Sequence, residues 1–123
     1  MDNNLKILSV NINGLTSPAK RNQTLKKLTK QKMDIICLQE VHVRAQDERF
    51  LQYKKLGKLY TALAEGKKRG VVVYVRDGVE AEMLYMDSVG RTLILKVVWE
   101  QKILLVVIYA PNKKQDIYYK KMT

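Results

Sequence analysis

Polar residues stand at the ends of three apolar runs of this sequence. Asn11 and Glu40 each directly follow such a run, and Tyr109 and Asn112 close a third. In an open α/β sheet, ligands bind beyond the carboxyl ends of the strands. If the three runs are neighbouring parallel strands, Asn11, Glu40 and Asn112 share one edge of the sheet. One carboxylate with amide oxygens beside it suits Mg²⁺, which takes few protein ligands and keeps several waters.

A strand, a helix and a second strand would position the first two of these residues. Leu5–Val10 and Asp34–Gln39 are predicted to be buried strands. The helix between them should start at Ser17-Pro18, because serine caps helices and proline suits the first helical position. It should run to about Lys32, with Leu25, Leu28 and Ala19 facing inward. Short links make this a βαβ unit with parallel strands.

The remaining sequence is typical of antiparallel strands. A short helix is expected over Gln46–Lys55, and Asp77-Gly78 is a signal for a tight turn in a hairpin. Five strand-like runs are predicted at Lys58–Ala64, Val71–Val75, Val79–Met86, Thr92–Trp99 and Ile103–Tyr109. The fold class is therefore α/β with a mixed β-sheet and flanking helices. VVVYV and ILLVVIY are apolar at successive positions, so both faces of these strands need cover that one long and one short helix cannot supply.

Length and charge limit the classes of function. The 123 residues suit one domain, residues 1–123. Lys and Arg number 23 against 12 Asp and Glu, a net charge of +11, which favours a nucleic-acid partner over a membrane surface. No stretch approaches 18 apolar residues, so no membrane span is expected. The start MDNNLKILSV is unlike a secretory signal and Cys37 is the single cysteine, which together predict an intracellular protein, nuclear or cytoplasmic.

Three motifs in order carry a resemblance to a known family. NINGL at 11–15, DIICLQEVH at 34–42 and IYAPN at 108–112 resemble the endonuclease domain of LINE-type (non-LTR) retrotransposons, and GKKRGVVVYV at 66–75 is similar as well. That domain is part of the endonuclease/exonuclease/phosphatase superfamily, which is similar to deoxyribonuclease I. The resemblance implies a two-sheet α/β sandwich, of which this chain would be about half, the part with the first sheet.

The resemblance also implies roles for individual residues. Glu40 matches the metal-binding glutamate, and Asn11 matches the asparagine that helps to hold Mg²⁺ and the scissile phosphate. Tyr109 matches a tyrosine that contacts the phosphate, and Asn112 matches an asparagine of the DNA-contacting surface. Basic residues beside this edge are candidates for DNA phosphate contacts: Lys20, Arg21, Lys113 and Lys114.

The sequence also departs from the family pattern. The family continues with an Asp-x-Asn motif and an Asp-His pair, and neither a GD nor a DH dipeptide occurs here. His42, the only histidine, is expected to orient Glu40 or to pack rather than to replace the missing base. We therefore expect an amino-terminal half that does not cleave DNA by itself. The alternatives are a non-catalytic module that binds nucleic acid or protein, and a remnant of a mobile element without a molecular role.

Other residues have structural interpretations. Asn13-Gly14 is expected to be a turn, Asn11 itself could serve that turn, and Cys37 is expected in the core. If the sheet face that the second half covers is left open, the chain should dimerise, aggregate or need a partner, with apolar side chains exposed on central strands.

Overall fold

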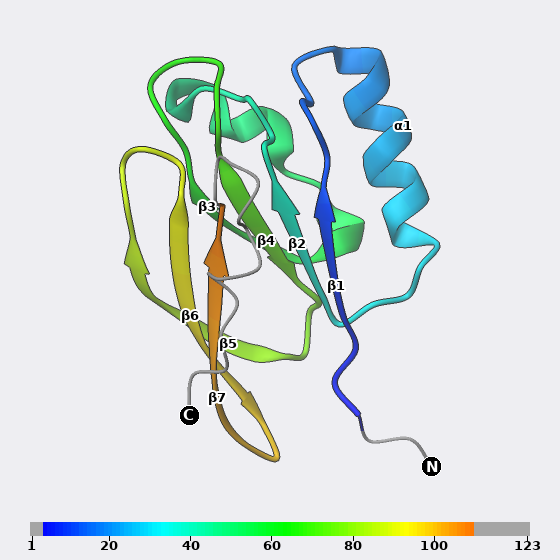
Figure 1. Ribbon diagram of the computed structural model, residues 1–123. Coiled ribbons are helices and arrows are strands. Elements are labelled where there is room, and N and C mark those ends of the chain that lie inside the picture. The colour runs from blue at the N-terminus through cyan, green and yellow to red at the C-terminus, as the bar shows by residue number, and fades with distance from the viewer. Residues whose placement is uncertain (1–3, 110–123) are drawn as a thin grey trace.

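The computed structural model describes residues 4–109, which form two β-sheets facing each other with one α-helix on the outside (Figure 1). The four-stranded sheet has the order β1-β2-β4-β3 and the three-stranded sheet the order β5-β6-β7. The elements are β1 (Ile7–Asn11), α1 (Pro18–Thr29), β2 (Ile35–Gln39), the 3₁₀ segments η1 (Ala45–Leu51) and η2 (Lys54–Leu56), β3 (Lys58–Ala62), β4 (Val71–Val75), β5 (Glu80–Met86), β6 (Thr92–Trp99) and β7 (Gln101–Ile108).

The expected βαβ unit is confirmed. β1 and β2 are parallel, and α1 starts at Pro18 with the Ser17 hydroxyl oxygen accepting the Lys20 backbone N–H at 3.4 Å. Leu25 and Leu28 are buried as predicted, but Ala19 is exposed and the helix ends at Thr29, before Lys32. The short helix predicted over Gln46–Lys55 is instead a pair of 3₁₀ segments.

The four-stranded sheet is mixed, as predicted, because β4 runs antiparallel to both β2 and β3. Asp77-Gly78 does lie in a turn, in which the Val79 N–H donates to the Arg76 carbonyl at 3.1 Å. The turn is not part of a hairpin, however. β4 already pairs with a strand on each side, so β5 cannot join it and begins a second sheet. β7 pairs with β6 in that second sheet, so the expectation that the third apolar run is a parallel neighbour of β1 and β2 is wrong.

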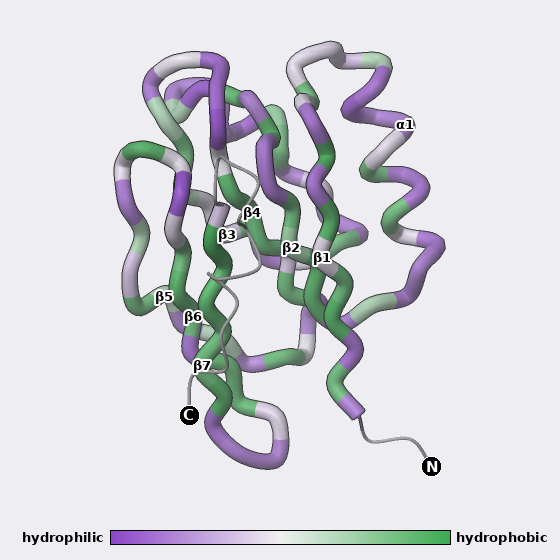
Figure 2. The backbone as a smooth tube through the Cα atoms, viewed as in Figure 1, coloured by the Kyte–Doolittle hydropathy of each residue, from purple (hydrophilic) through white to green (hydrophobic). Residues whose placement is uncertain are grey.

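The predicted α/β class is confirmed. The chain contributes strands to two facing sheets, however, so the expectation that it supplies only the first sheet is wrong. On β1 and β2, alternate residues face two different cores: Ile36 and Leu38 pack toward α1, whereas Ile35 and Cys37 pack toward the second sheet. All five residues of β4 are buried, since both of its faces are covered. Figure 2 shows hydrophobic residues concentrated along the strands and hydrophilic residues over α1 and the loops.

Apolar exposure occurs in places other than those predicted. β1 is an edge strand that is only partly buried, and Ile7 is 42% exposed, because only β2 pairs with it. The central strands of the first sheet expose no large apolar side chain. The largest apolar exposures on the second sheet lie on its edge strands and the β5–β6 turn: Met83, Leu84, Tyr85, Met86, Val89 and Leu104.

Among residues 4–109, no helix combines the length and the apolar character that crossing a bilayer requires.

Candidate functional site

Five segments that are distant in sequence meet at the carboxyl end of β2, and we call this region the rim: residues 11–15, 40–42, 69–70, 90–91 and Tyr109. A relay of backbone hydrogen bonds joins each segment to the next. The bonds run from the N–H to the carbonyl in Gly14–Glu40 (2.7 Å), Leu15–Val41 (2.8 Å), Val41–Gly70 (3.2 Å), His42–Arg69 (2.8 Å), Gly70–Gly90 (2.9 Å) and Tyr109–Arg91 (2.8 Å). The backbone of the rim is therefore held by hydrogen bonds between its segments, and these bonds also connect the two sheets.

Two glycines allow this close approach of the two sheets. Gly70 has φ +101° and Gly90 has φ +80°, both in the left-handed region that glycine tolerates best. A Cβ at Gly70 would lie 2.7 Å from the Val41 Cγ2 atom, and a Cβ at Gly90 would lie 2.7 Å from the Gly70 backbone nitrogen. Neither position has room for a side chain without a shift of its neighbours.

Non-glycine residues with left-handed backbone gather at the rim. Asn13 (φ 52°), Glu40 (φ 56°), His42 (φ 58°) and Arg69 (φ 55°) are four of the six such residues between positions 4 and 109. This conformation is costly for side chains other than glycine and asparagine, and it persists where surrounding structure enforces it. The relay of hydrogen bonds supplies that enforcement. Strained backbone of this kind concentrates at functional sites.

The Glu40 carboxylate lies within reach of the Tyr109 hydroxyl and of His42. The side chain of Glu40 is 21% exposed, and its Oε2 atom lies 4.0 Å from Nε2 of His42. The hydrogen bond to Glu40 raises the pKa of Tyr109 above its usual 10.0; burial and the Glu40 charge add to this, and Arg69 and Arg91 partly oppose it. The sequence-predicted residues Glu40 and Tyr109 are thus brought together, although they belong to different sheets.

Asn11 ends β1, the strand next to the one that Glu40 directly follows. Its Cα pairs in register with that of Gln39, and the next residue, Ile12, donates its N–H to the Gln39 carbonyl at 2.9 Å. The Asn11 Oδ1 atom accepts the Asn13 N–H at 3.1 Å, so Asn11 does shape the turn that precedes Gly14. An amide oxygen has a second lone pair, which this bond leaves available.

The donor chemistry at the rim fits a hard divalent cation. Glu40 offers carboxylate oxygens and Asn11 an amide oxygen, which Mg²⁺ prefers over nitrogen or sulfur. Within the described part of the chain, no three His, Cys, Asp or Glu side chains cluster as a metal cage would require. Mg²⁺ does not need such a cage, because it binds through one or two carboxylates and retains waters.

The remaining sequence-predicted residues have mixed outcomes. The Lys20 ammonium donates to the carbonyls of Ile12 (3.5 Å) and Asn13 (3.2 Å), so it lies at the first rim segment. Arg21 donates from one Nη1 nitrogen to the carbonyls of Leu15 (3.2 Å) and Thr16 (3.5 Å). The predicted contacts Asn112, Lys113 and Lys114 lie outside the described residues.

Sequence reasoning missed two arginines at the rim. Arg69 and Arg91 both lie near enough to the Tyr109 hydroxyl to affect its pKa. Arg69 was visible as part of the basic GKKRG stretch, but nothing in the sequence connects it to Glu40. Arg91 follows the turn residue Gly90 and carries no motif, so it could be found only from the fold.

Comparison with known proteins agrees with this architecture. Residues 8–99 match the model of the Endonuclease/Exonuclease/phosphatase family. The fold is similar to the Xenopus laevis APE2 catalytic domain, with a TM-score of 0.67, 20% identity, and coverage of 91% of this chain and 47% of that one. It is also similar to the endonuclease domain of TRAS1, a telomere-specific non-LTR retrotransposon, with a TM-score of 0.59, 17% identity, and coverage of 92% and 49%. The chain thus spans about half the length of these two structures.

Proposed function

The chain belongs to the Endonuclease/Exonuclease/phosphatase family, and we propose that it forms the amino-terminal half of a Mg²⁺-dependent DNA endonuclease domain from a LINE-type retrotransposon. The observation that carries this proposal is the convergence of Glu40 and Tyr109, from different sheets, at the braced rim. The resemblance of its motifs to those retrotransposon domains and the fold shared with the TRAS1 domain support the retrotransposon origin.

In this proposal Glu40 and Asn11 hold the cation and the scissile phosphate. When bound, Mg²⁺ would polarise a phosphoryl oxygen and stabilise the oxygen that leaves. The pKa of Tyr109 is raised above its usual 10.0, so its hydroxyl keeps its proton at physiological pH. In this proposal the hydroxyl donates its one hydrogen bond to a phosphate oxygen in place of the Glu40 carboxylate, which the cation binds. Arg69 and Arg91 place two permanent positive charges beside that hydroxyl, where a phosphate would be bound.

We further propose that this chain by itself is catalytically incomplete. General acid–base groups contribute about 10²- to 10⁴-fold to such reactions. The Gly-Asp-x-Asn form of the Asp-x-Asn motif and the Asp-His pair that the resemblance leads one to expect do not occur among the 123 residues, which contain no GD and no DH dipeptide. We propose that His42, whose Nε2 atom lies 4.0 Å from Oε2 of Glu40, orients that carboxylate and does not replace the missing base.

Plasmid nicking tests this proposal. Supercoiled DNA is incubated with Mg²⁺ and the chain, alone or fused to the carboxyl-terminal half of the TRAS1 domain. The fusion should nick the plasmid, and Glu40→Ala should abolish that activity, whereas the chain alone should not nick. Nicking by the chain alone that disappears in Glu40→Ala would show that the chain is a complete enzyme. A folded fusion whose nicking is insensitive to Glu40→Ala would contradict the metal role of Glu40.

The second candidate function is a non-catalytic module that binds nucleic acid. The net charge of +11 favours it, since such an excess attracts phosphates whether or not cleavage follows. We expect weak binding with little sequence preference and about three to five phosphate contacts, each adding about 0.9 to the slope of log K against log salt. An affinity that does not change between about 50 and 200 mM salt contradicts this expectation.

The exposed apolar side chains of the second sheet are the proposed contact for a second copy or for the missing half. Met83, Tyr85 and Leu104 are 42%, 51% and 55% exposed on its edge strands. Exposed apolar patches of several hundred Å² mark interfaces or aggregation-prone surfaces. Sedimentation should therefore show self-association that a Leu104→Lys variant weakens; a stable monomer at high concentration contradicts this.

A further inference from the structure

A groove of about 480 Å³ lies next to the rim, between the start of α1 and the segment that leads into η1. His42 lines it and also lies 4.0 Å from Glu40, so the groove and the candidate metal corner are adjacent. Its lining includes the charged side chains of Arg21, Arg44, Asp47 and Lys67 and the ring of Phe50. Arg44 belongs to none of the motifs that point to a nuclease, whereas Lys67 is part of the basic GKKRG stretch.

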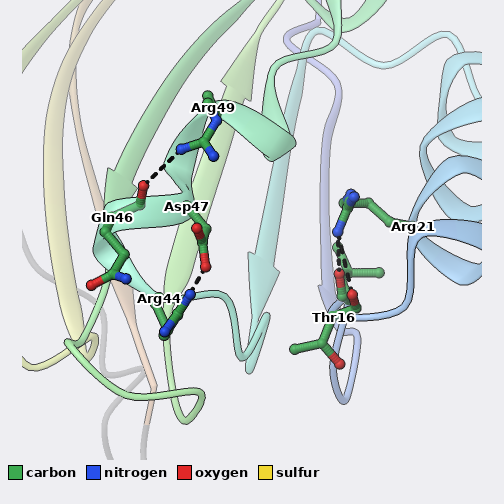
Figure 3. A network of polar contacts seen from close by, with 7 residues as sticks. Thr16, Arg21, Arg44, Gln46, Asp47 and Arg49 are labelled. Carbon is green, nitrogen blue, oxygen red and sulfur yellow. Dashed lines mark hydrogen bonds and ion pairs between the residues drawn. The ribbon is translucent and has the colours of Figure 1, made fainter.

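Arg21 and Arg44 line this groove, and Arg49 contacts the ring of the lining residue Phe50. Each of the three arginines is held by one part of its guanidinium group (Figure 3). Arg44 donates from Nε to Oδ2 of Asp47 at 2.8 Å. Arg49 donates from Nη1 to the Gln46 carbonyl at 3.1 Å, and Arg21 donates from Nη1 to the carbonyls of the β1–α1 loop. A guanidinium has five N–H donors. Within the described part of the chain these bonds occupy only one or two of the five in each arginine.

Phe50 fixes two of these arginines further. The guanidinium carbon of Arg21 lies 5.0 Å from the centre of the Phe50 ring, and that of Arg49 lies 4.5 Å from it. Phe50 is 44% exposed, so its ring remains accessible beside the two guanidinium groups that it contacts. Arginines that are already held in place lose little conformational entropy when they bind an anion.

The charge of the groove favours an anion. Its lining carries Arg21, Arg44 and Lys67 against one carboxylate, Asp47, which is already paired with Arg44. Positively charged grooves with arginine on aromatic rings are the means by which proteins follow a nucleic-acid backbone. The lining also includes the apolar side chains of Val43 and Pro18.

We propose that this groove binds the phosphate backbone of the nucleic-acid strand that passes the Glu40 corner, with Arg44, Lys67 and the Phe50-supported arginines as the phosphate contacts. The inference rests on the proposed function. It adds that the groove binds the part of the nucleic-acid strand that flanks the phosphate at Glu40. Because the contacts are to phosphates, binding along the groove should be independent of sequence.

Salt-dependent binding of a short fluorescent DNA, single-stranded in one arm and duplex in the other, tests this inference. The double variant Arg44→Gln/Lys67→Gln should lower the slope of log K against log salt by about 1.4 to 1.8, the value for two lost phosphate contacts. The matched control, Lys26→Gln/Lys30→Gln, removes two positive charges from exposed positions at the C-terminal end of α1. Its slope of log K against log salt should stay close to that of the wild type. The arm with the larger decrease identifies the form of DNA that enters the groove.

Phe50→Leu provides a second variant that keeps the charge. It should weaken binding about two- to fivefold through loss of the two cation–π contacts, whereas Phe50→Tyr should bind as the wild type does. Equal decreases in slope for the groove and control variants, with an unaffected Phe50→Leu, would overturn the groove while leaving the proposed function intact. Absence of any salt-dependent binding by the folded wild-type chain would instead contradict the proposed function itself.

Discussion

Two carboxylates flank the same strand, β2, and they have opposite surroundings. Asp34 directly precedes the strand, and its side chain is 10% exposed. Its Oδ1 atom pairs with Nη2 of Arg76 at 2.6 Å, and its Oδ2 atom accepts the Lys6 N–H at 2.9 Å. Glu40 directly follows the strand. It has a left-handed backbone, and its carboxylate is shared between the Tyr109 hydroxyl and His42 without a closely paired arginine or lysine in the described part of the chain.

The difference separates a group that stabilises the fold from a group that is available for a ligand. Both carboxylate oxygens of Asp34 accept hydrogen bonds from protein donors. These bonds stabilise the end of the sandwich opposite the rim. The position of Glu40 is instead set by its backbone, through the carbonyl that accepts the Gly14 N–H. Its carboxylate adds little to stability, and a cation can bind it without breaking an ion pair with arginine or lysine.

The largest expected effect is on the backbone that holds Glu40. Gly70→Ala should lower the free energy of unfolding by about 3 kcal/mol, because the new Cβ meets Val41 at 2.7 Å and φ is +101°. Gly78→Ala is the matched control: its φ is +98°, but nothing lies within 4 Å, so only the conformational cost of about 1 kcal/mol remains. Urea denaturation of both variants measures this. Equal losses would mean that the contact at Gly70 does not brace the rim.

The next effect compares the two carboxylates directly. Asp34→Ala should cost about 2 kcal/mol of unfolding free energy, since it removes an ion pair and leaves the Lys6 N–H without its acceptor. Glu40→Ala should change that free energy by less than about 0.5 kcal/mol. Denaturant titrations of the two single variants decide this. A large loss for Glu40→Ala would mean that Glu40 is also a structural residue.

Acid should reduce the stability that Asp34 contributes at the start of β2. Burial alone would raise the pKa of Asp34, but the Lys6 backbone hydrogen bond and Arg76 outweigh it and hold the pKa below its usual 3.8. A lowered folded-state pKa gives stability that is complete above 3.8 and is lost as the pH falls through the folded-state pKa. The wild type should therefore lose more stability on acidification below this value than Asp34→Asn, as thermal melts would measure. Parallel losses would contradict the pairing.

The smallest effect concerns the Tyr109 hydroxyl at the Glu40 end. Its pKa should lie above 10.0 and should fall toward that value in Glu40→Gln, because the neutral amide accepts a weaker hydrogen bond and carries no charge. Tyrosine ring carbon shifts in an NMR titration report this residue separately from the other tyrosines. Asp34→Asn serves as the control and should leave the Tyr109 pKa unchanged.

Part of this account was predictable from the sequence. Apolar runs bounded by turn signals set the limits of β4 and β6 correctly, and the motif around Glu40 directed attention to that carboxylate. The assignment of strands to sheets was not predictable, since the Asp77-Gly78 turn looks alike whether β5 joins β4 or starts another sheet. The meeting of Glu40 with Tyr109, and of Tyr109 with Arg69 and Arg91, depends on how the two sheets stack, which local patterns do not encode.

Binding of Mn²⁺, a paramagnetic substitute for Mg²⁺, tests the central claim that the Glu40 corner is a cation site. The chain, Glu40→Gln and Asp34→Asn are titrated and followed by electron paramagnetic resonance, with circular dichroism to verify folding. Both variants lose one carboxylate charge next to the same strand, so they are matched in net charge. Our account predicts that Glu40→Gln weakens Mn²⁺ binding at least about tenfold and that Asp34→Asn does not. Equal binding by wild type and Glu40→Gln would contradict it.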